Sequence, residues 1–441
     1  MKVNTEKYIK LCPISSDQKH SFNQMLGTIQ RDNIKAVSFN IFDTLIMSPF
    51  LYPTDLFFML EKDFSDVNTG KKSFSQVRTE AENNIRKKND SSEATLSEIY
   101  EEIQKLCDIS PSSAQKLMER EKELELYFCY PRECGMELFS EAIRAGKNVV
   151  LVSETALPKD LVIKMLNKCN ISGYKNIFLS NQVHLSKSDG EIYKHIAKKL
   201  KCKPYDVIHI GSNIQLDVEA PINSEMMSLY VPNCRELFFK SGRLCSYIYA
   251  QLGKKINTDR YFPVRCLMAM YASYAFDYPS NEVKQGDFCQ NYYYMGFIVL
   301  GGLYMYKDFI INDDIEAMII ASMRENPQIA DGEKDFIEIY KRRFGDFLER
   351  FSFEGCNLPF NLLVNHADIS DREFFSEKYS AFEYEKWNEK ISEPNLSGNI
   401  QNPVKTSPKT KNKKKKASLS DTLFPKGSWQ KNFLDKLLKN K

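Results

Sequence analysis

The sequence predicts a doubly wound α/β fold, in which helices cover both faces of a parallel sheet, with a long helical insertion near its start. Short apolar segments rich in β-branched residues alternate with helical patterns, as they do in βαβ units. Each apolar segment runs into a short polar loop. About a hundred residues with helical periodicity separate the first apolar segment from the second.

The first apolar segment, Ile34–Ile46 (IKAVSFNIFDTLI), organises the prediction. Its β-branched and aromatic residues indicate a buried strand that ends at Asn40, and a polar turn with Asp43 and Thr44 follows. Ligands bind at the carboxyl edge of an open α/β sheet. We therefore expect Asn40 to lie in a functional site.

Three later stretches have the same design, a strand followed by a polar residue. Taken singly, each polar residue has a simpler explanation, because a serine after a strand often caps the next helix and a lone lysine is usually exposed. The stretches are Gly146–Val162 with Ser153, Asn176–Leu200 with Lys187 in a K-S-D-G turn, and Asp206–Pro221 with Ser212 and Asp217.

The four stretches, in this order, resemble the four motifs of the haloacid dehalogenase-like (HAD) superfamily of phosphohydrolases. The resemblance is to the subgroup whose first motif reads FDIFDTL and whose fourth reads HIGDNxxSD, and it covers about residues 30–235. It implies a Rossmann-like core with a cap domain after the first motif. It also implies that Ser153 binds a phosphate oxygen, that Lys187 balances negative charge and that Asp217 helps to hold Mg²⁺.

The chain departs from this pattern at three positions. Asn40 replaces the aspartate nucleophile, Phe42 occupies the general-acid position and Ser212 replaces an acidic metal ligand. An amide has no negative charge and cannot attack phosphorus as a carboxylate does, and Asp43 is the only acid nearby. Mg²⁺ favours carboxylate oxygens. We therefore predict weak or absent Mg²⁺ binding. A pairing of Asp217 with Lys187 would favour a site that has lost its activity.

The helical insertion, residues 48–145, corresponds to the cap. Arg78 and Glu82 lie one helical turn apart. Arg78 suits a phosphate or a sugar acid if it faces the pocket. The alternative is an ordinary i,i+4 surface pair.

The composition divides the chain after about residue 240 into three parts. We expect a mostly helical second domain with an interaction role at 240–390, a disordered Lys/Pro/Ser-rich linker at 394–425 and an amphipathic basic helix at 426–441. This helix suits an anionic membrane surface or a partner groove, or folds back onto its own chain. No motif supports specific nucleic-acid binding. Residues 1–30 are expected to be a lead-in, and residues 31–47 and 146–235 form the α/β core.

Composition points to a cytoplasmic protein. Of the 441 residues 42% are hydrophobic and 27% are charged, and the net charge is +3. Eleven scattered cysteines without a CxxC pair, and no apolar signal segment after Met1, indicate reduced thiols. The most apolar stretch, Tyr292–Tyr306, is shorter than the ~20 residues of a spanning helix, so we expect a core helix there. Attachment to the inner membrane face through the C-terminal helix is a further expectation.

Three functions fit these observations. The first is a pseudoenzyme, a binding or scaffolding module in bacterial surface-polysaccharide biosynthesis, a pathway implied only by resemblance to predicted hydrolases encoded among its glycosyltransferases. The second is an active phosphatase of sugar phosphates or similar metabolites, which requires Asp43 or another group as a recruited nucleophile, or an Asn40 engineered from Asp. The third is a sensor that binds a small phosphorylated ligand through Ser153, Lys187 and backbone amides.

Overall fold

A computed structural model describes residues 8–11, 18–68, 70–88, 94–241 and 243–278. These residues belong to one compact unit of the chain. Most of the expected second domain, the linker and the C-terminal helix lie outside the described residues. None of the described helices combines the length and the apolar composition that crossing a bilayer requires.

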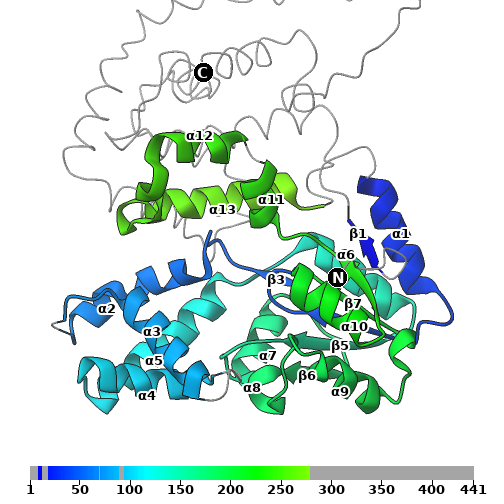
Figure 1. Ribbon diagram of the computed structural model, residues 1–441, viewed down its shortest axis with the longest axis horizontal. Coiled ribbons are helices and arrows are strands. Elements are labelled where there is room, and N and C mark those ends of the chain that lie inside the picture. Colours follow the sequence, from blue (N-terminus) through cyan, green and yellow to red (C-terminus); the bar gives the residue numbers. More distant parts are fainter. Residues whose placement is uncertain (1–7, 12–17, 69, 89–93, 242, 279–441) are drawn as a thin grey trace, which may run out of the picture. The chain divides into compact units, whose positions relative to one another are not determined.

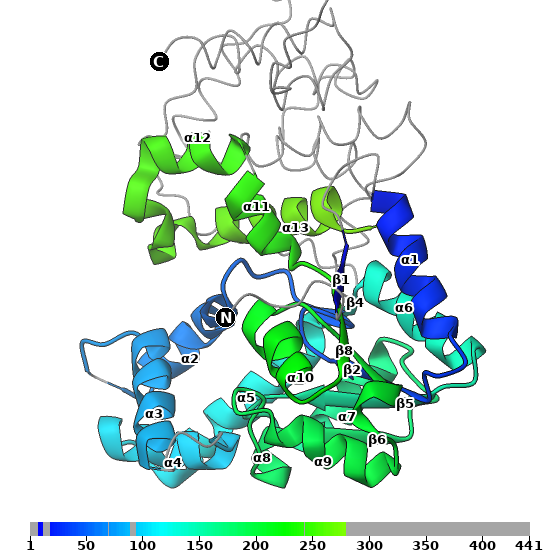
Figure 2. The ribbon, with the colours of Figure 1, turned by 45° about the vertical axis from the view of Figure 1, so that its right-hand side comes forward.

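The core is a six-stranded parallel sheet with β2 near its centre (Figures 1 and 2). This topology, with helices against the sheet, confirms the predicted doubly wound, Rossmann-like fold. In spatial order the strands are β1 (Tyr8–Lys10), β8 (Met227–Tyr230), β7 (Val207–Gly211), β2 (Ala36–Asn40), β5 (Asn148–Ser153) and β6 (Asn176–Leu179). A separate antiparallel pair joins β3 (Ile46–Met47) to β4 (Tyr130–Pro131).

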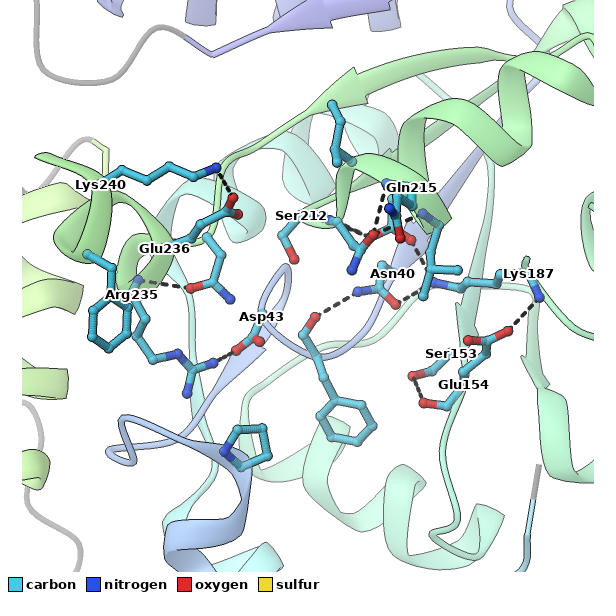
Figure 3. A pocket seen from close by; sticks show the side chains of 18 of the residues that line it. Asn40, Asp43, Ser153, Glu154, Lys187, Ser212, Gln215, Arg235, Glu236 and Lys240 are labelled. Carbon is cyan, nitrogen blue, oxygen red and sulfur yellow. Dashed lines mark hydrogen bonds and ion pairs between the residues drawn. The ribbon is translucent and has the colours of Figure 1, made fainter. Parts of the chain in front are cut away.

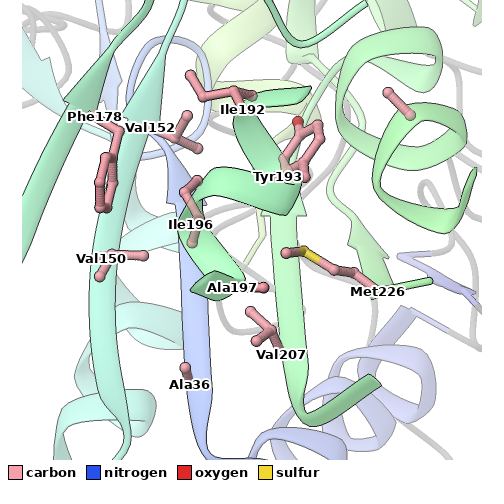
Figure 4. Packing of buried hydrophobic residues seen from close by; sticks show 11 residues of the cluster. Ala36, Val150, Val152, Phe178, Ile192, Tyr193, Ile196, Ala197, Val207 and Met226 are labelled. Atoms are coloured by element: carbon pink, nitrogen blue, oxygen red, sulfur yellow. The ribbon is translucent and has the colours of Figure 1, made fainter. Parts of the chain in front are cut away.

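The central strands are buried on both faces, which explains their continuous apolar sequences. One face packs against α9, whose Ile192, Tyr193 and Ile196 contact a cluster that includes Val150 and Val152 (Figure 4). On the other face Phe39 of β2 meets Phe139 of α6, with ring centroids 5.5 Å apart. The helices around the sheet are α1 (Gln18–Gln30), α6 (Glu133–Arg144), α7 (Lys159–Lys168), α8 (Ser180–Val183), α9 (Glu191–Leu200) and α10 (Ala220–Asn223).

The insertion forms its own group of helices beside the sheet (Figures 1 and 2). Thr95 caps α4 by accepting a hydrogen bond from the backbone N–H of Glu98, and the Glu98 carboxylate accepts one from the backbone N–H of Thr95. Ser110 and Pro111 begin α5. The helices are η2 (Pro53–Leu60), α2 (Glu61–Ser65), α3 (Phe74–Lys88), α4 (Leu96–Cys107) and α5 (Pro111–Phe128).

Two boundaries differ from the sequence-based ones. The lead-in is part of the core, because β1 pairs with β8 in parallel and α1 packs on α6. The pairing of β1 joins residues over two hundred positions apart, so no local pattern could indicate it. Helix α6, placed in the cap at 48–145, packs against α1 and β5 and belongs to the core. The helical insertion itself therefore ends near Phe128.

The helices that follow the sheet bind the start of the insertion. Arg265 donates two hydrogen bonds, of 2.6 and 2.9 Å, to the buried carboxylate of Asp55. Beside this ion pair, the rings of Phe58 and Phe262 stack with centroids 4.3 Å apart. These helices are α11 (Cys234–Ser241), α12 (Arg243–Leu252), η5 (Gly253–Asn257), η6 (Asp259–Tyr261) and α13 (Phe262–Phe276).

Candidate active site

A pocket of about 660 Å³ lies at the carboxyl edge of the sheet (Figure 3). The strand ends supply Asn40 from β2, Ser153 from β5 and Ser212 after β7. The rest of the set that the sequence predicted to lie together comes from two loops, which supply Asp43 and Lys187, and from the short helix η4 (Ile214–Glu219), which supplies Asp217. Thr44 lies buried beneath this pocket, and Arg78 lines a different cavity.

Both ends of the Asn40 amide have internal partners. The ammonium group of Lys187 donates to Asn40 Oδ1 at 2.7 Å, and Asn40 Nδ2 donates to the carbonyl oxygen of Phe42 at 2.7 Å. This orientation follows from the partners, since an ammonium can only donate and a carbonyl can only accept. An aspartate could not make the second bond. Position 40 is thus matched to an amide.

The carboxylate of Asp217 is saturated by donors. Its Oδ1 accepts hydrogen bonds from Lys187 Nζ at 2.7 Å and His209 Nε2 at 3.2 Å. Its Oδ2 accepts from the backbone N–H groups of Ser212 at 3.0 Å and Asn213 at 2.9 Å. Burial disfavours the anion, but the ammonium and the imidazole outweigh it and hold the pKa of Asp217 well below its usual range.

Gly211, at the end of β7, makes this position of Asp217 possible. A Cβ atom at residue 211 would lie 2.3 Å from Cγ of Asp217, which is inside contact distance. Only glycine lets the aspartate carboxylate approach the strand so closely.

His209 supports Asp217 from within the sheet, a role that the sequence analysis missed. The imidazole is fully buried, and Nδ1 lies 3.0 Å from the hydroxyl of Ser38 on β2. Burial lowers the pKa of His209, so the ring is neutral at pH 7, with Nε2–H donating to Asp217 and Nδ1 accepting from Ser38. The available signal was two polar side chains within apolar strands, Ser38 in AVSFN and His209 in VIHIG.

A pH dependence of stability follows from His209. Its folded pKa is depressed, so the unfolded chain binds the proton more readily, and stability falls as pH drops below the unfolded value of about 6.5. Between pH 7 and pH 5, the free energy of unfolding of the unchanged chain should fall by about 1–2 kcal/mol more than that of the His209→Gln variant. In this variant the glutamine amide can still donate a hydrogen bond to Asp217. Urea unfolding at both pH values measures this difference. Parallel pH profiles for the two proteins would contradict it.

Asp43 follows the strand with a left-handed backbone, at φ 57°. Its carboxylate forms an ion pair with Arg235 of α11, and Arg235 Nη1 donates to the carbonyl oxygen of Phe50 at 2.6 Å. Arg132 donates to the backbone oxygen of Asp43 at 2.6 Å. Both arginines are buried, and the sequence analysis predicted neither, because each lies about 90 or more positions from Asp43.

The remaining polar residues of the predicted set hold one another in place. Thr44 Oγ1 donates to Ser212 Oγ at 3.3 Å. Ser153 is buried, and its hydroxyl lies 3.4 Å from the backbone oxygen of Glu154. The Glu154 carboxylate accepts the backbone N–H of Lys187 at 2.6 Å, which positions the lysine over Asn40 and Asp217.

Arg78 lies in the insertion, where it is buried in an ion-pair network. It forms the expected i,i+4 pair with Glu82, at 2.8 Å. Its other donors bind the carboxylate of Glu121 on α5, at 3.0 to 3.3 Å. This pair is therefore not a surface pair, because the Arg78 side chain is 4% exposed.

No family model and no curated protein matches this chain. Similar solved structures include a haloacid dehalogenase-like family hydrolase from Xanthomonas campestris, 19% identical with a TM-score of 0.34, covering 46% of this chain and 84% of that one. A predicted phosphoglycolate phosphatase from Haemophilus somnus is 13% identical with a TM-score of 0.33, covering 46% and 91%. The magnesium-bound HAD hydrolase YfnB from Bacillus subtilis is 11% identical with a TM-score of 0.35, covering 46% and 97%.

Proposed function

We propose that this chain is a pseudoenzyme, a protein with a HAD-like hydrolase fold that binds a ligand or a partner without hydrolysing it. The most direct support for this proposal is that the polar side chains of the site are hydrogen-bonded to one another. Asn40 uses both ends of its amide on internal partners, and Lys187 joins Asn40 to Asp217. The groups that would act on a phosphate are thus engaged with one another.

The donor set does not suit Mg²⁺. Magnesium sites use carboxylate oxygens, with water and substrate phosphate completing the octahedron. Here both oxygens of Asp217 already accept two donors each, and Ser212 is neutral. Among the residues that the structure describes, no group of three acidic, histidine or cysteine side chains is placed to hold a metal.

The alternative, an active phosphatase, requires a nucleophile other than Asn40, and Asp43 is the nearby candidate. Its carboxylate is paired with the buried guanidinium of Arg235, and attack on phosphorus would require it to leave this partner. Burial lowers the pKa of Arg235 to about 10, which still leaves the guanidinium charged at neutral pH. Asp43 is therefore better suited to fixing the turn after β2.

The test is phosphatase activity of the purified chain against a panel of sugar phosphates with Mg²⁺. We expect no turnover above that of the Lys187→Met variant, which lacks the ammonium that bridges Asn40 and Asp217. Turnover at an enzyme-like rate that Lys187→Met or Asp43→Asn abolishes would overturn the proposal and establish the phosphatase.

We further propose that the module serves surface-polysaccharide biosynthesis and that residues 426–441 attach it to an anionic membrane or a partner. Both ideas rest on the sequence, and the tail lies outside the described residues. Lysines near an anionic surface contribute about 1 kcal/mol each, so the basic helix favours such a surface.

We expect deletion of residues 395–441 to abolish cosedimentation with vesicles that contain anionic lipid. Neutral vesicles serve as the control, because they remove the attraction to lysine. If the full chain and the truncated chain sediment alike, the tail has no anchoring role.

A further inference from the structure

A second cavity, of about 270 Å³, lies between the insertion and the core. It adjoins the candidate active-site pocket, because Phe42, Asp43 and Arg235 line both. Apolar side chains from the insertion and from α7 form part of its wall, among them Phe57 and Met165. The cavity therefore has space and apolar surface for a small organic molecule.

Carboxyl groups outnumber guanidinium groups among the described residues that line this cavity. The two arginines of α3 form ion pairs with two of these acids. Arg78 binds Glu121 and Glu82, and Arg86 donates to the other oxygen of Glu82 at 2.8 and 3.1 Å. Arg235 is paired with Asp43. The carboxyl groups are those of Asp43, Glu82, Glu121, Glu125 and Glu154, and the guanidinium groups are those of Arg78, Arg86 and Arg235.

Among the described acids that line the cavity, Glu125 is the one without a hydrogen-bond or ion-pair partner. It lies one helical turn after Glu121 on α5 and keeps some accessible surface, because it faces the cavity. No described residue donates a hydrogen bond to its carboxyl group. Burial, and then the charge of Glu121, raise the pKa of Glu125 to about 7. Of these two causes, the repulsion by the charge of Glu121 is the one that an added positive charge would relieve.

We propose that this cavity binds the protonated amine of a sugar-sized ligand, with the ammonium group on the Glu125 carboxylate. The ammonium would supply the positive charge that the excess of carboxylates favours, and the apolar wall would cover the carbon skeleton. The inference rests on the proposed function, in which the chain binds a ligand without hydrolysing it. It adds the chemical class of that ligand.

Binding of an ammonium group requires Glu125 to lose its proton, so affinity and pH are linked. With a pKa of about 7 for this carboxyl group, affinity should rise about tenfold between about pH 6 and pH 8. The probe is glucamine, a primary alkylamine that stays protonated over this range as a lysine side chain does. Sorbitol, which carries a hydroxyl group in place of the amine, is the neutral counterpart.

Isothermal titration calorimetry of the full chain with both probes tests the proposal. We expect glucamine to bind more tightly than sorbitol, with the tenfold pH dependence. Glu125→Gln should lose both the preference and the pH dependence. Glu123→Gln is the matched control, because Glu123 lies on the same helix with its side chain 66% exposed, and it should behave as the unchanged chain.

Equal binding of the two probes, or an amine preference that survives Glu125→Gln, would show the proposal to be wrong. A second measurement does not depend on affinity: the ¹³C signal of the Glu125 carboxyl group, assigned by its loss in Glu125→Gln, should titrate near pH 7. Titration near its ordinary value would also overturn the proposal. Phosphatase activity would refute the proposed function alone and leave these results unchanged.

Discussion

The double variant Asn40→Asp, Ser212→Asp should hydrolyse small sugar phosphates with Mg²⁺ at least about a hundredfold faster than the unchanged chain. The first substitution provides a carboxylate at the end of β2, next to Lys187. The second places a carboxylate at the end of β7, where Ser212 now meets Thr44. The two new carboxylates add oxygens at the sheet edge beside Asp217, whose own oxygens already accept four donors. Carboxylate oxygens are the ligands that Mg²⁺ favours.

The rate gain should need both substitutions. Without Mg²⁺, the negative charge of the phosphate is not neutralised and repels the attacking carboxylate. Asn40→Asp, Asn213→Asp is the matched control, since it adds the same charge one residue away, at a side chain that caps the following helix. It should remain inactive. A control variant as active as the intended one would show that added charge, not the position of the carboxylate, is responsible.

The second large effect is on stability. Arg132→Met should lower the free energy of unfolding by about 3–5 kcal/mol, because it removes one partner of a buried ion pair. Arg132 Nε donates to Asp277 at 2.9 Å, and the guanidinium also donates to the carbonyl oxygens of Asp43 and Pro232, at 2.6 and 2.8 Å. Without it, a buried carboxylate loses its charged donor, and two carbonyl oxygens lose a guanidinium donor. Arg132→Lys should recover only part of this loss, because an ammonium lacks the planar set of donors.

Arg120→Met is the control for the loss of an arginine side chain. Arg120 is 46% exposed and pairs with the exposed Glu123 at 3.0 Å, so its loss should cost less than about 1 kcal/mol. Denaturant unfolding of the unchanged chain and of the three variants (Arg132→Met, Arg132→Lys and Arg120→Met) provides the comparison. Equal losses for Arg132→Met and Arg120→Met would mean that the buried network contributes nothing beyond a surface pair.

The α/β core could be predicted from the sequence because its signals are local. A buried parallel strand has a continuous apolar run, and the polar residue that follows falls at the carboxyl edge for geometric reasons alone. Asn40, Ser153 and Ser212 could therefore be assigned to one site before any contact was known. The lack of a negative charge at position 40 could also be read from the sequence, since the side chain of Asn40 ends in a neutral amide.

Other features depend on contacts between distant residues. Arg132 and Arg235 reach the turn after β2 from positions about 90 and 190 residues away, and β1 joins the sheet through a strand near residue 228. A single arginine or a three-residue strand has no periodicity that would reveal its partner. The saturation of Asp217 likewise required the positions of four donors.

The sequence by itself determined the fold class, the strands that carry the site and the absence of an aspartate at position 40. Only the tertiary structure decided how the remaining polar groups are engaged. It pairs Asp217 with Lys187 and His209 and binds Asp43 to Arg235. It also leaves Glu125 facing a cavity without a donor from any residue that the structure describes. The physical reason is that strand and helix patterns arise from neighbouring residues, whereas the charge state and availability of a buried group depend on every element packed around it.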